Sequence, residues 1–304
     1  MRFNGGTVDK TDVILCQLLL GNSRLSYREL ADKLNLSVTA VHNRIQALID
    51  IGIISKFTAR LSLFAQNAIH LLIFGYTRTN SIISLKQKLE KNKCVYWLAV
   101  GGGNFLYVGL YLQNIGEMDD VVRFVKETAQ MPEPTVGLTA SPLPFVQKNV
   151  NFETKLCELD FKIVRSLRGD SRKATNVIAN ELGVAAKTVS RRLSRMQKNY
   201  LIELSIDWYP DASNDIISIF HIQLKSDTNP NAANLILQKY YPNTLFYWSL
   251  TNLPNNYIFM VWTPTSKELK NIRENIEQET AISSVTPNVI FTGYIFDSWR
   301  NQIP

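Results

Sequence analysis

Residues 21–54, GNSRLSYRELADKLNLSVTAVHNRIQALIDIGII, decide the fold because residues 169–202, GDSRKATNVIANELGVAAKTVSRRLSRMQKNYLI, repeat their pattern. The two stretches align without a gap at a constant shift of 148 residues. The identical pairs include Gly21 and Gly169, Ser23 and Ser171, Arg24 and Arg172, Ala31 and Ala179, Leu34 and Leu182, Val41 and Val189, Arg44 and Arg192, and Ile54 and Ile202. The segments downstream correspond more loosely, so the chain is an internal duplication. Its seam is expected near residues 141–155, where prolines and polar residues are typical of a linker.

Each copy begins with three short helical patterns followed by strand-like residues. In the first copy, helices are predicted at residues 12–20, 26–34 and 37–49. Ser26 and Glu29 have the spacing of a capping box, and Ser37 is a favourable N-cap for the third helix. The few residues between the second and third helices leave room only for a tight turn, which predicts a helix-turn-helix.

The second part of each copy has the predicted order βαββαβ, which is typical of a ferredoxin-like sheet with helices on one face. The fold class is therefore α+β, with two winged or helix-turn-helix domains alternating with two ferredoxin-like domains. We expect helix-turn-helix domains at residues 1–60 and 148–208, and ferredoxin-like domains at 61–147 and 209–304.

The third helix of each copy is the candidate nucleic-acid reader. Val41, Ile45 and Leu48 are spaced so that they face the core, which turns Thr39, Asn43 and Gln46 outward. In the second copy the same reasoning places basic residues on the outward face, with Arg192 on its flank. The residues expected to contact DNA are Thr39, Asn43, Arg44, Gln46, Lys187, Thr188, Arg191, Arg192, Arg195 and Lys198.

The positive charge of the chain is concentrated in these helical parts. The formal net charge is +7; residues 8–58 hold six Lys or Arg against five acids, and residues 156–206 hold ten against five. A solvated helix normally intersperses acids with its bases, so the pattern favours a polyanionic partner. Double-stranded DNA is favoured over RNA, because the second helix of a helix-turn-helix fits the wide major groove.

Residues 24–59, RLSYRELADKLNLSVTAVHNRIQALIDIGIISKFTA, resemble the helix-turn-helix of the Lrp/AsnC (feast/famine) transcription regulators. The matching features are ELA, the pattern of Ser37, Thr39, Val41, Arg44 and Ile45, and the closing GII. The βαββαβ unit around VGGGNFLYVGLYL resembles the ligand-sensing and dimerising domain of that family. The second copy departs from the pattern at Ala174 and Ala185, where the first has cap serines, and at Tyr200, where the first has Gly52.

The resemblance implies a sequence-specific DNA-binding transcription regulator. Family members pair two ferredoxin-like domains, and this chain already holds two, so we expect a pseudo-dimer with two unequal readers that forms a further homo-oligomer. Pairing of each domain with another chain remains the alternative. In relatives a loop between the central strands lies at an effector site; here that loop is Gly101, Gly102, Gly103 and Asn104, without the usual Asp.

Two other functions stay open. Relatives with this layout include sirohaem decarboxylases that use histidine and basic residues, and this chain offers His42, His70 and His221, of which the last two do not lie at matching positions of the two copies. The other alternative is an architectural protein that coats DNA without sequence preference. The sequence has no paired carboxylates, nucleophile elbow, P-loop or metal-ligand spacing, so we predict no enzyme, cofactor or metal.

The composition is that of an ordinary globular protein, with 45% hydrophobic and 19% charged residues. No apolar run reaches membrane-spanning length and the start lacks a signal-peptide core, so we expect a cytoplasmic protein without a membrane partner. Cys16, Cys94 and Cys157 are far apart, which favours reduced thiols over disulfides or a metal site.

Overall fold

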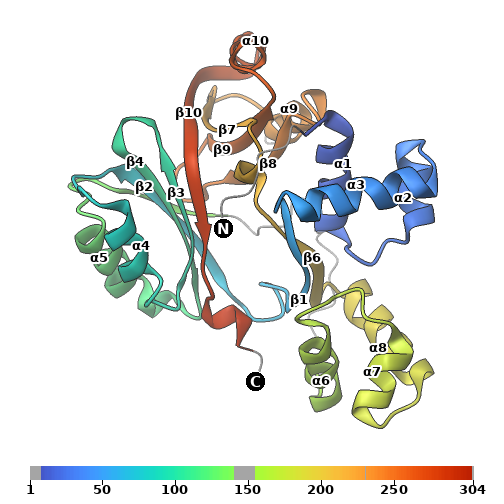
Figure 1. The fold of residues 1–304 in the computed structure, drawn as a ribbon. Coiled ribbons are helices and arrows are strands. Elements are labelled where there is room, and N and C mark those ends of the chain that lie inside the picture. The colour runs from blue at the N-terminus through green and yellow to red at the C-terminus, as the bar shows by residue number, and fades with distance from the viewer. Residues whose placement is uncertain (1–7, 140–154, 230, 303–304) are drawn as a thin grey trace.

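The computed structural model describes residues 8–139, 155–229 and 231–302, so nearly all of the expected seam at 141–155 lies outside the described residues. Two three-helix units are present (Figure 1). The first consists of α1 (Lys10–Gly21), α2 (Tyr27–Leu34) and α3 (Val38–Asp50), and the second of α6 (Glu158–Leu167), α7 (Thr175–Leu182) and α8 (Ala186–Lys198). The helix-turn-helix prediction is confirmed for both copies.

The helix ends of the two units are built differently. Ser26 caps α2 with a complete capping box to Glu29, and the Ser37 side chain accepts from the Ala40 N–H at the start of α3. At the corresponding ends of α7 and α8, Ala174 and Ala185 provide no side-chain cap. Because a Ser-to-Ala change at an N-cap costs about 1 kcal/mol, the second unit depends more on tertiary contacts.

A two-stranded antiparallel ribbon joins the helical units to the rest of the chain. It pairs β1 (Ile54–Leu61) with β6 (Ile202–Trp208), and Thr58 lies opposite Ser205. Helix α1 packs on β6 and α6 packs on β1, so each helical unit contacts the ribbon strand of the other copy. The two copies are therefore interlocked within one chain.

The remaining strands form one eight-stranded sheet in the order β5-β2-β4-β3-β10-β7-β9-β8. Their bounds are β2 Ile69–Tyr76, β3 Val95–Gly101, β4 Phe105–Leu112, β5 Thr135–Leu138, β7 Ile216–Leu224, β8 Thr244–Ser249, β9 Asn256–Thr263 and β10 Ile282–Ile295. Strand β10 joins the two ferredoxin-like halves by pairing with β3. The ends of the two outer strands, β5 and β8, also meet. Thr139 and Leu250 form an isolated β-bridge, and the Thr251 N–H donates a 2.7 Å hydrogen bond to the Leu138 carbonyl.

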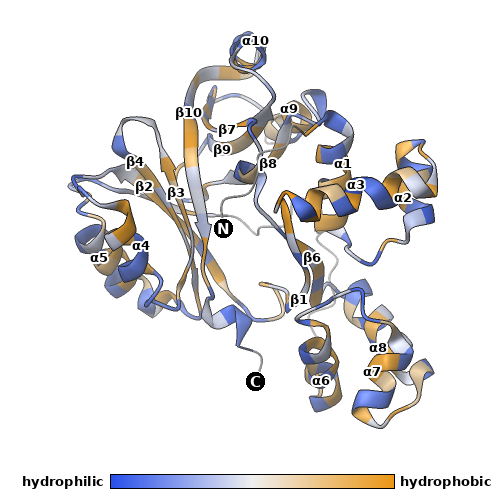
Figure 2. Cartoon of the chain, in the orientation of Figure 1, coloured by the Kyte–Doolittle hydropathy of each residue, from blue (hydrophilic) through white to orange (hydrophobic). Residues whose placement is uncertain are grey.

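Helices cover the outside of each half-sheet (Figure 1). Helices α4 (Ile82–Leu89) and α5 (Met118–Thr128) bury Leu85 and Val125 against the first half, and α9 (Ala232–Lys239) and α10 (Ser266–Glu277) bury Ile236 and Ile276 against the second. Figure 2 shows hydrophilic and hydrophobic residues interspersed along α3 and α8, as in helices with one buried side. The βαββαβ order and the α+β class are confirmed in both copies.

The largest core lies between the inner faces of the two half-sheets and continues into the first helical unit. Tyr107 and Ile219 come from opposite halves and are completely buried in the same cluster as Leu15 and Val41 of α1 and α3. The first helical unit is therefore anchored to the sheet, and the second has a smaller core of its own with Ala59 and Leu61 of β1. Among the described residues no helix is long and apolar enough to span a membrane.

Candidate nucleic-acid interface

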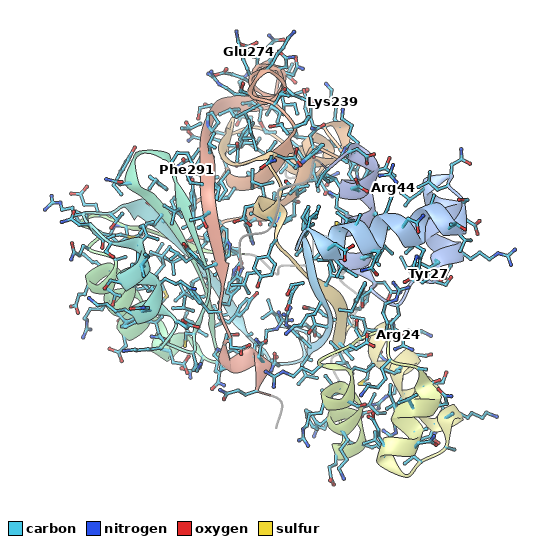
Figure 3. The ribbon with its side chains drawn as sticks, viewed as in Figure 1. Arg24, Tyr27, Arg44, Lys239, Glu274 and Phe291 are labelled. Atoms are coloured by element: carbon cyan, nitrogen blue, oxygen red, sulfur yellow. The ribbon has the colours of Figure 1, made fainter. Side chains whose placement is uncertain are left out.

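The two helix-turn-helix units meet at residues that correspond to each other in the duplication. The buried hydroxyls of Ser23 and Ser171 lie 2.6 Å apart. Arg24 donates to the carbonyls of Ser171 and Lys173 at 2.7 and 2.8 Å, and Arg172 donates to the Leu25 carbonyl at 2.7 Å. Figure 3 shows Arg24 where the first unit meets the second. These reciprocal contacts describe a pseudo-twofold axis that fixes the spacing of α3 and α8.

Helix α3 presents a polar, weakly charged surface. Thr39, Asn43 and Gln46 are exposed, as the helical spacing predicted, while Val41 and Ile45 are buried. The Gln46 amide donates to Asp50 at 2.9 Å, which occupies one of its two N–H groups. The Asn43 amide has no hydrogen bond to another described residue. Its NH2 group is therefore available as a donor and its carbonyl oxygen as an acceptor.

Helix α8 presents the basic surface. Lys187, Arg191 and Lys198 are exposed, and none of them has an ion pair with any residue in the described parts of the chain. Thr188 is half-buried, so less of its hydroxyl side is available. We call Lys187, Arg191 and Lys198 the α8 basic face.

Arg44 and Arg192 occupy equivalent positions and are both engaged inside their domains. Arg44 donates to Asp12 at 2.7 Å and lies 2.9 Å from Asp9, and Arg192 donates to Asp160 at 3.1 Å. The carboxylates are equivalent too, because Asp12 and Asp160 stand on α1 and α6 at the same shift. Figure 3 shows Arg44 on α3. Each arginine therefore ties the third helix of its unit to the first.

The placement of Arg195 corrects the helical-wheel expectation. It was expected on the free outward face, but its guanidinium forms an ion pair with the same Asp160 and the side chain retains 37% exposure. The first copy has Ala47 at this position, so the additional cation belongs to the second unit alone. Asp160 was missed in the sequence because a carboxylate on one helix gives no sign of which neighbouring helix it will meet.

Asp160 is completely buried and ionised. Its burial alone would raise the pKa of its carboxyl, but hydrogen bonds from the Cys157 backbone and side chain, together with Arg192 and the nearby charge of Arg195, lower that pKa. The Cys157 N–H donates to the carboxylate at 2.9 Å and completes the cap of α6. The one carboxylate is therefore shared by two guanidinium groups, Arg192 and Arg195.

The loop expected to bind an effector is a short turn between β3 and β4. Gly102 N–H donates to the Asn288 side chain at 2.8 Å, and a Cβ on Gly101 would lie 2.7 Å from the same amide. Gly103 and Asn104 have positive φ values of 67° and 59°. The glycines thus serve the turn and the close approach of Asn288, and effector binding by this loop stays a prediction.

Of the two strand histidines, His70 is buried and His221 half-buried, and this burial suppresses the charge of both. His70 is bonded to the hydroxyls of Thr139 at 2.7 Å and Tyr96 at 2.9 Å, and burial lowers its pKa to about 3. His221 is 2.7 Å from the Tyr107 hydroxyl, and burial lowers its pKa to about 4. They are neutral near pH 7, when each can donate one hydrogen bond and accept one. No cluster of metal-ligating side chains occurs among the residues described.

Comparison with known domain families identifies the two helical units. Residues 8–55 match the winged helix-turn-helix DNA-binding domain, and residues 157–197 match the AsnC-type helix-turn-helix domain. An uncharacterised HTH-type transcriptional regulator of Pyrococcus furiosus is 47% identical over 55 residues, which are 18% of this chain and 37% of that protein. The chain thus spans little more than a third of that relative. These matches place the chain in the class of helix-turn-helix proteins.

Longer matches define the family. An uncharacterised HTH-type transcriptional regulator of Pyrococcus horikoshii is 33% identical over 123 residues, covering 39% of this chain and 80% of the relative. The regulator LrpA of the same organism is 29% identical over 111 residues, covering 36% of this chain and 79% of LrpA. The chain belongs to the Lrp/AsnC-type helix-turn-helix regulator family, in a tandem form.

A solved structure matches the fold over nearly the whole length. The siroheme decarboxylase NirDL covers 97% of this chain, and the chain covers 96% of NirDL, with a TM-score of 0.61 and 15% sequence identity. At this identity the likeness concerns the fold alone. It shows that the two-copy architecture occurs in a protein of nearly equal extent.

Proposed function

We propose that the protein is a sequence-specific transcription regulator that binds double-stranded DNA as a pseudo-dimer with two unequal readers. The observation that carries this proposal is the reciprocal contact of the two helix-turn-helix units about one pseudo-twofold axis, with exposed polar or basic side chains on α3 and α8. The membership in a regulator family supports the same function. Because both reader helices belong to one chain, their sequences can differ from each other. In a homodimer the two reader helices would be identical.

The two reader helices have different roles in this proposal. The α8 basic face carries three cations that form no ion pair with the residues that the structure describes. It suits phosphates, which supply affinity but little sequence information. On α3, Asn43 and Gln46 carry amides, and an amide can pair with an adenine edge through two hydrogen bonds. Thr39 adds a hydroxyl and a methyl group to that face. We therefore assign most of the discrimination to α3 and most of the attraction to α8.

Arg44, Arg192 and Arg195 have a positioning role in this proposal. Each is bonded to a carboxylate of its own unit, so contact with DNA would have to share its guanidinium with that carboxylate or break the pair. For Asp160 the loss would be large, since an unpaired buried carboxylate costs several kcal/mol. These arginines hold the reader helices at a fixed angle to α1 and α6.

The test is selection of bound sequences from randomised duplex DNA, followed by competition of the best sequence against random duplex at physiological salt. We expect the selected sequence to bind at least about a thousandfold more tightly, as specific binders do. The Asn43→Ala variant should lose about 1–3 kcal/mol on the selected site and little on random DNA. Equal binding of both duplexes would instead support an architectural protein.

A tetrapyrrole-modifying enzyme is the second candidate, favoured by the shared fold with NirDL over nearly the whole chain. The described residues fit it poorly. His70 is buried and His221 is half-buried, and burial lowers the pKa of both side chains, so they are neutral near pH 7. The cavity between the β1/β6 ribbon and the sheet is lined by Arg60 and Arg300, and both are paired with carboxylates, Asp207 and Glu203. A porphyrin with many carboxylates would find no free cation there.

Titration with an iron-uroporphyrin III analogue, followed by visible absorbance, distinguishes the two candidates. We expect no saturable spectral change at equimolar protein and ligand. A stoichiometric shift of the porphyrin band that is lost in the Arg300→Gln variant would favour the enzyme.

A further inference from the structure

A cavity of about 280 Å³ lies between the β1/β6 ribbon and the eight-stranded sheet, at the point where the helical units are attached. We call it the ribbon cavity. Its volume is close to that of sites for small organic ligands, which begin at about 300 Å³. One wall is formed by the end of β6 from Ile206 onward and by Tyr209 just after it. The sheet contributes Trp97, Trp248 and Gly293 from β3, β8 and β10.

The walls of the ribbon cavity are rich in aromatic rings. Trp97 and Trp248 have ring centroids 5.9 Å apart, and Phe246 meets Trp248 edge to face at 4.8 Å. Indole and phenyl faces carry a negative potential that attracts cations, and Trp is the strongest of them. An aromatic wall therefore accepts both an apolar body and a positive group.

The charged groups in the walls are balanced except for one. Arg60 is paired with Asp207, and Arg300 with Glu203. Asp211, on the short turn η3 (Pro210–Ala212), has no ion pair with any residue in the described parts of the chain. Its Oδ2 accepts from the Gly293 N–H at 2.9 Å, and burial raises the pKa of its carboxyl. A cation beside this carboxylate would offset the cost of its buried charge.

Asp211 and the aromatic wall meet at Gly293. A Cβ on this glycine would lie 3.7 Å from the Asp211 carboxylate and 3.8 Å from Nε1 of Trp97, so the carboxylate and an indole border the same point. A positive group placed there meets the Asp211 carboxylate, and the N–H edge of Trp97 lies beside it. The remaining aromatic and aliphatic surface is available to the rest of the ligand.

The same turn is tied to the reader α3. The Tyr209 N–H donates to the Ile53 carbonyl at 2.8 Å, just after α3 ends. Asp211 also borders a hollow lined by Ile49 and Gly52 at that end of the helix. The turn η3 therefore contacts the cavity on one side and the base of the reader on the other.

We propose that the ribbon cavity binds a small organic cation with an aromatic or aliphatic body, which pairs with Asp211 and alters DNA binding by fixing η3 against the end of α3. The effect of the ligand on DNA binding, the regulatory half of the proposal, rests on the proposed DNA-binding function. Binding of the ligand to the cavity does not depend on that function.

The test uses three probes with the same phenyl body and different charge, namely 2-phenylethylammonium, 2-phenylethanol and phenylacetate, followed by tryptophan fluorescence. We expect 2-phenylethylammonium to bind at least about tenfold more tightly than 2-phenylethanol and phenylacetate to bind least. The Asp211→Asn variant keeps an acceptor for Gly293 and should bind the amine and the alcohol equally. Asp215→Asn, four residues later on the same connection and outside the cavity wall, is the matched control and should keep the preference.

Gly293→Ala is a second variant, because its Cβ fits at ordinary contact distances and fills the point beside Asp211. It should weaken amine binding while leaving the thermal midpoint unchanged. Equal affinity for the three probes, preference for phenylacetate, no saturable binding of any probe at about 10 mM, or identical behaviour of Asp211→Asn and Asp215→Asn would overturn the site.

The regulatory half is measured on the selected duplex with saturating 2-phenylethylammonium. We expect the Kd for DNA to change at least about threefold in the unmodified protein and not in Asp211→Asn. An unchanged Kd overturns the regulatory half only. A protein that binds no duplex contradicts the proposed function, while the fluorescence titrations still decide the site.

Discussion

At Tyr200 the second copy keeps the left-handed backbone of the first copy but has a bulky side chain in place of glycine. Tyr200 follows α8 with φ 53°, and Gly52 stands at the corresponding position after α3 with φ 83°. Both reader helices end in a left-handed residue, which glycine adopts readily and a bulky side chain does not. The duplication therefore kept the conformation and changed the residue.

Replacing Tyr200 by Gly should stabilise the second unit by about 0.5–1 kcal/mol, because the strain of the left-handed Tyr exceeds the entropic penalty of glycine. The measurement is the midpoint of urea unfolding. Tyr200→Ala is the control, since it removes the exposed ring but keeps a Cβ and should not stabilise. Equal effects of the two variants would contradict the backbone explanation.

At the scale of elements, the buried face of each third helix was predictable from the sequence. The residues of neighbouring helices that it contacts were not. The spacing of Val41, Ile45 and Leu48 fixes which side of α3 is buried, so the exposure of Asn43 follows from the sequence. The same wheel places Arg195 outward, and the structure pairs it with Asp160 on α6. Periodicity gives the face of one helix, but the position of a neighbouring helix depends on tertiary packing.

The site was therefore predicted in part. Local sequence patterns were enough to predict the duplication, the βαββαβ order and the two reader helices, because the same patterns occur in both copies. The closure of two half-sheets through β3 and β10 and the cavity under the ribbon require strands far apart in the chain to meet. No local pattern carries that information. The domain limits at 60, 147 and 208 stay predictions, and the second lies outside the described residues.

The Asp160→Asn variant tests the internal pairing at this scale. It removes the charge that Arg192 and Arg195 share, and we expect a loss of about 2–3 kcal/mol at neutral pH. The control is Glu158→Gln on the same helix, whose exposed pair with Lys162 should contribute much less.

The pH dependence of that loss has a definite sign. The folded-state pKa of Asp160 is lowered, so its contribution is present above the unfolded pKa, about 3.9, and is lost as pH falls through the folded value. The difference between the unmodified protein and Asp160→Asn should therefore be constant from about pH 5 to 7 and shrink below about pH 4. A difference that grows on acidification would contradict the assigned ion pair.

At the scale of the whole molecule, the chain is a pseudo-dimer whose halves have diverged. Ser23 and Ser171 still meet on the axis, and Thr58 still faces Ser205 across the ribbon. The reader surfaces have not stayed alike, because α8 carries the basic face and α3 carries amides. A further homo-oligomer stays a prediction, which the mass from sedimentation measurements would test. Phe291 on β10 is an exposed apolar side chain (Figure 3).

Asymmetric readers should prefer an asymmetric operator, because half-site symmetry mirrors protein symmetry. Once a binding sequence is selected, two artificial palindromes can be made, each from one half-site repeated. We expect both palindromes to bind more weakly than the selected sequence, by about 1–3 kcal/mol for each base pair that no longer matches its reader helix. Tighter binding of either palindrome would indicate that two chains supply identical readers.

The central claim, that the α8 basic face contacts DNA phosphates, is tested most directly by the salt dependence of duplex binding. The triple variant Lys187→Ala, Arg191→Ala, Lys198→Ala should reduce the slope of log K against log salt by about 2.7, corresponding to three phosphate contacts. Its matched control is Lys88→Ala, Lys91→Ala, Lys93→Ala, which removes three exposed charges at and after α4, away from α8 (Figure 1). The account predicts a flattened slope for the first variant and a nearly unchanged slope for the control. Equal slopes for the two variants would contradict it.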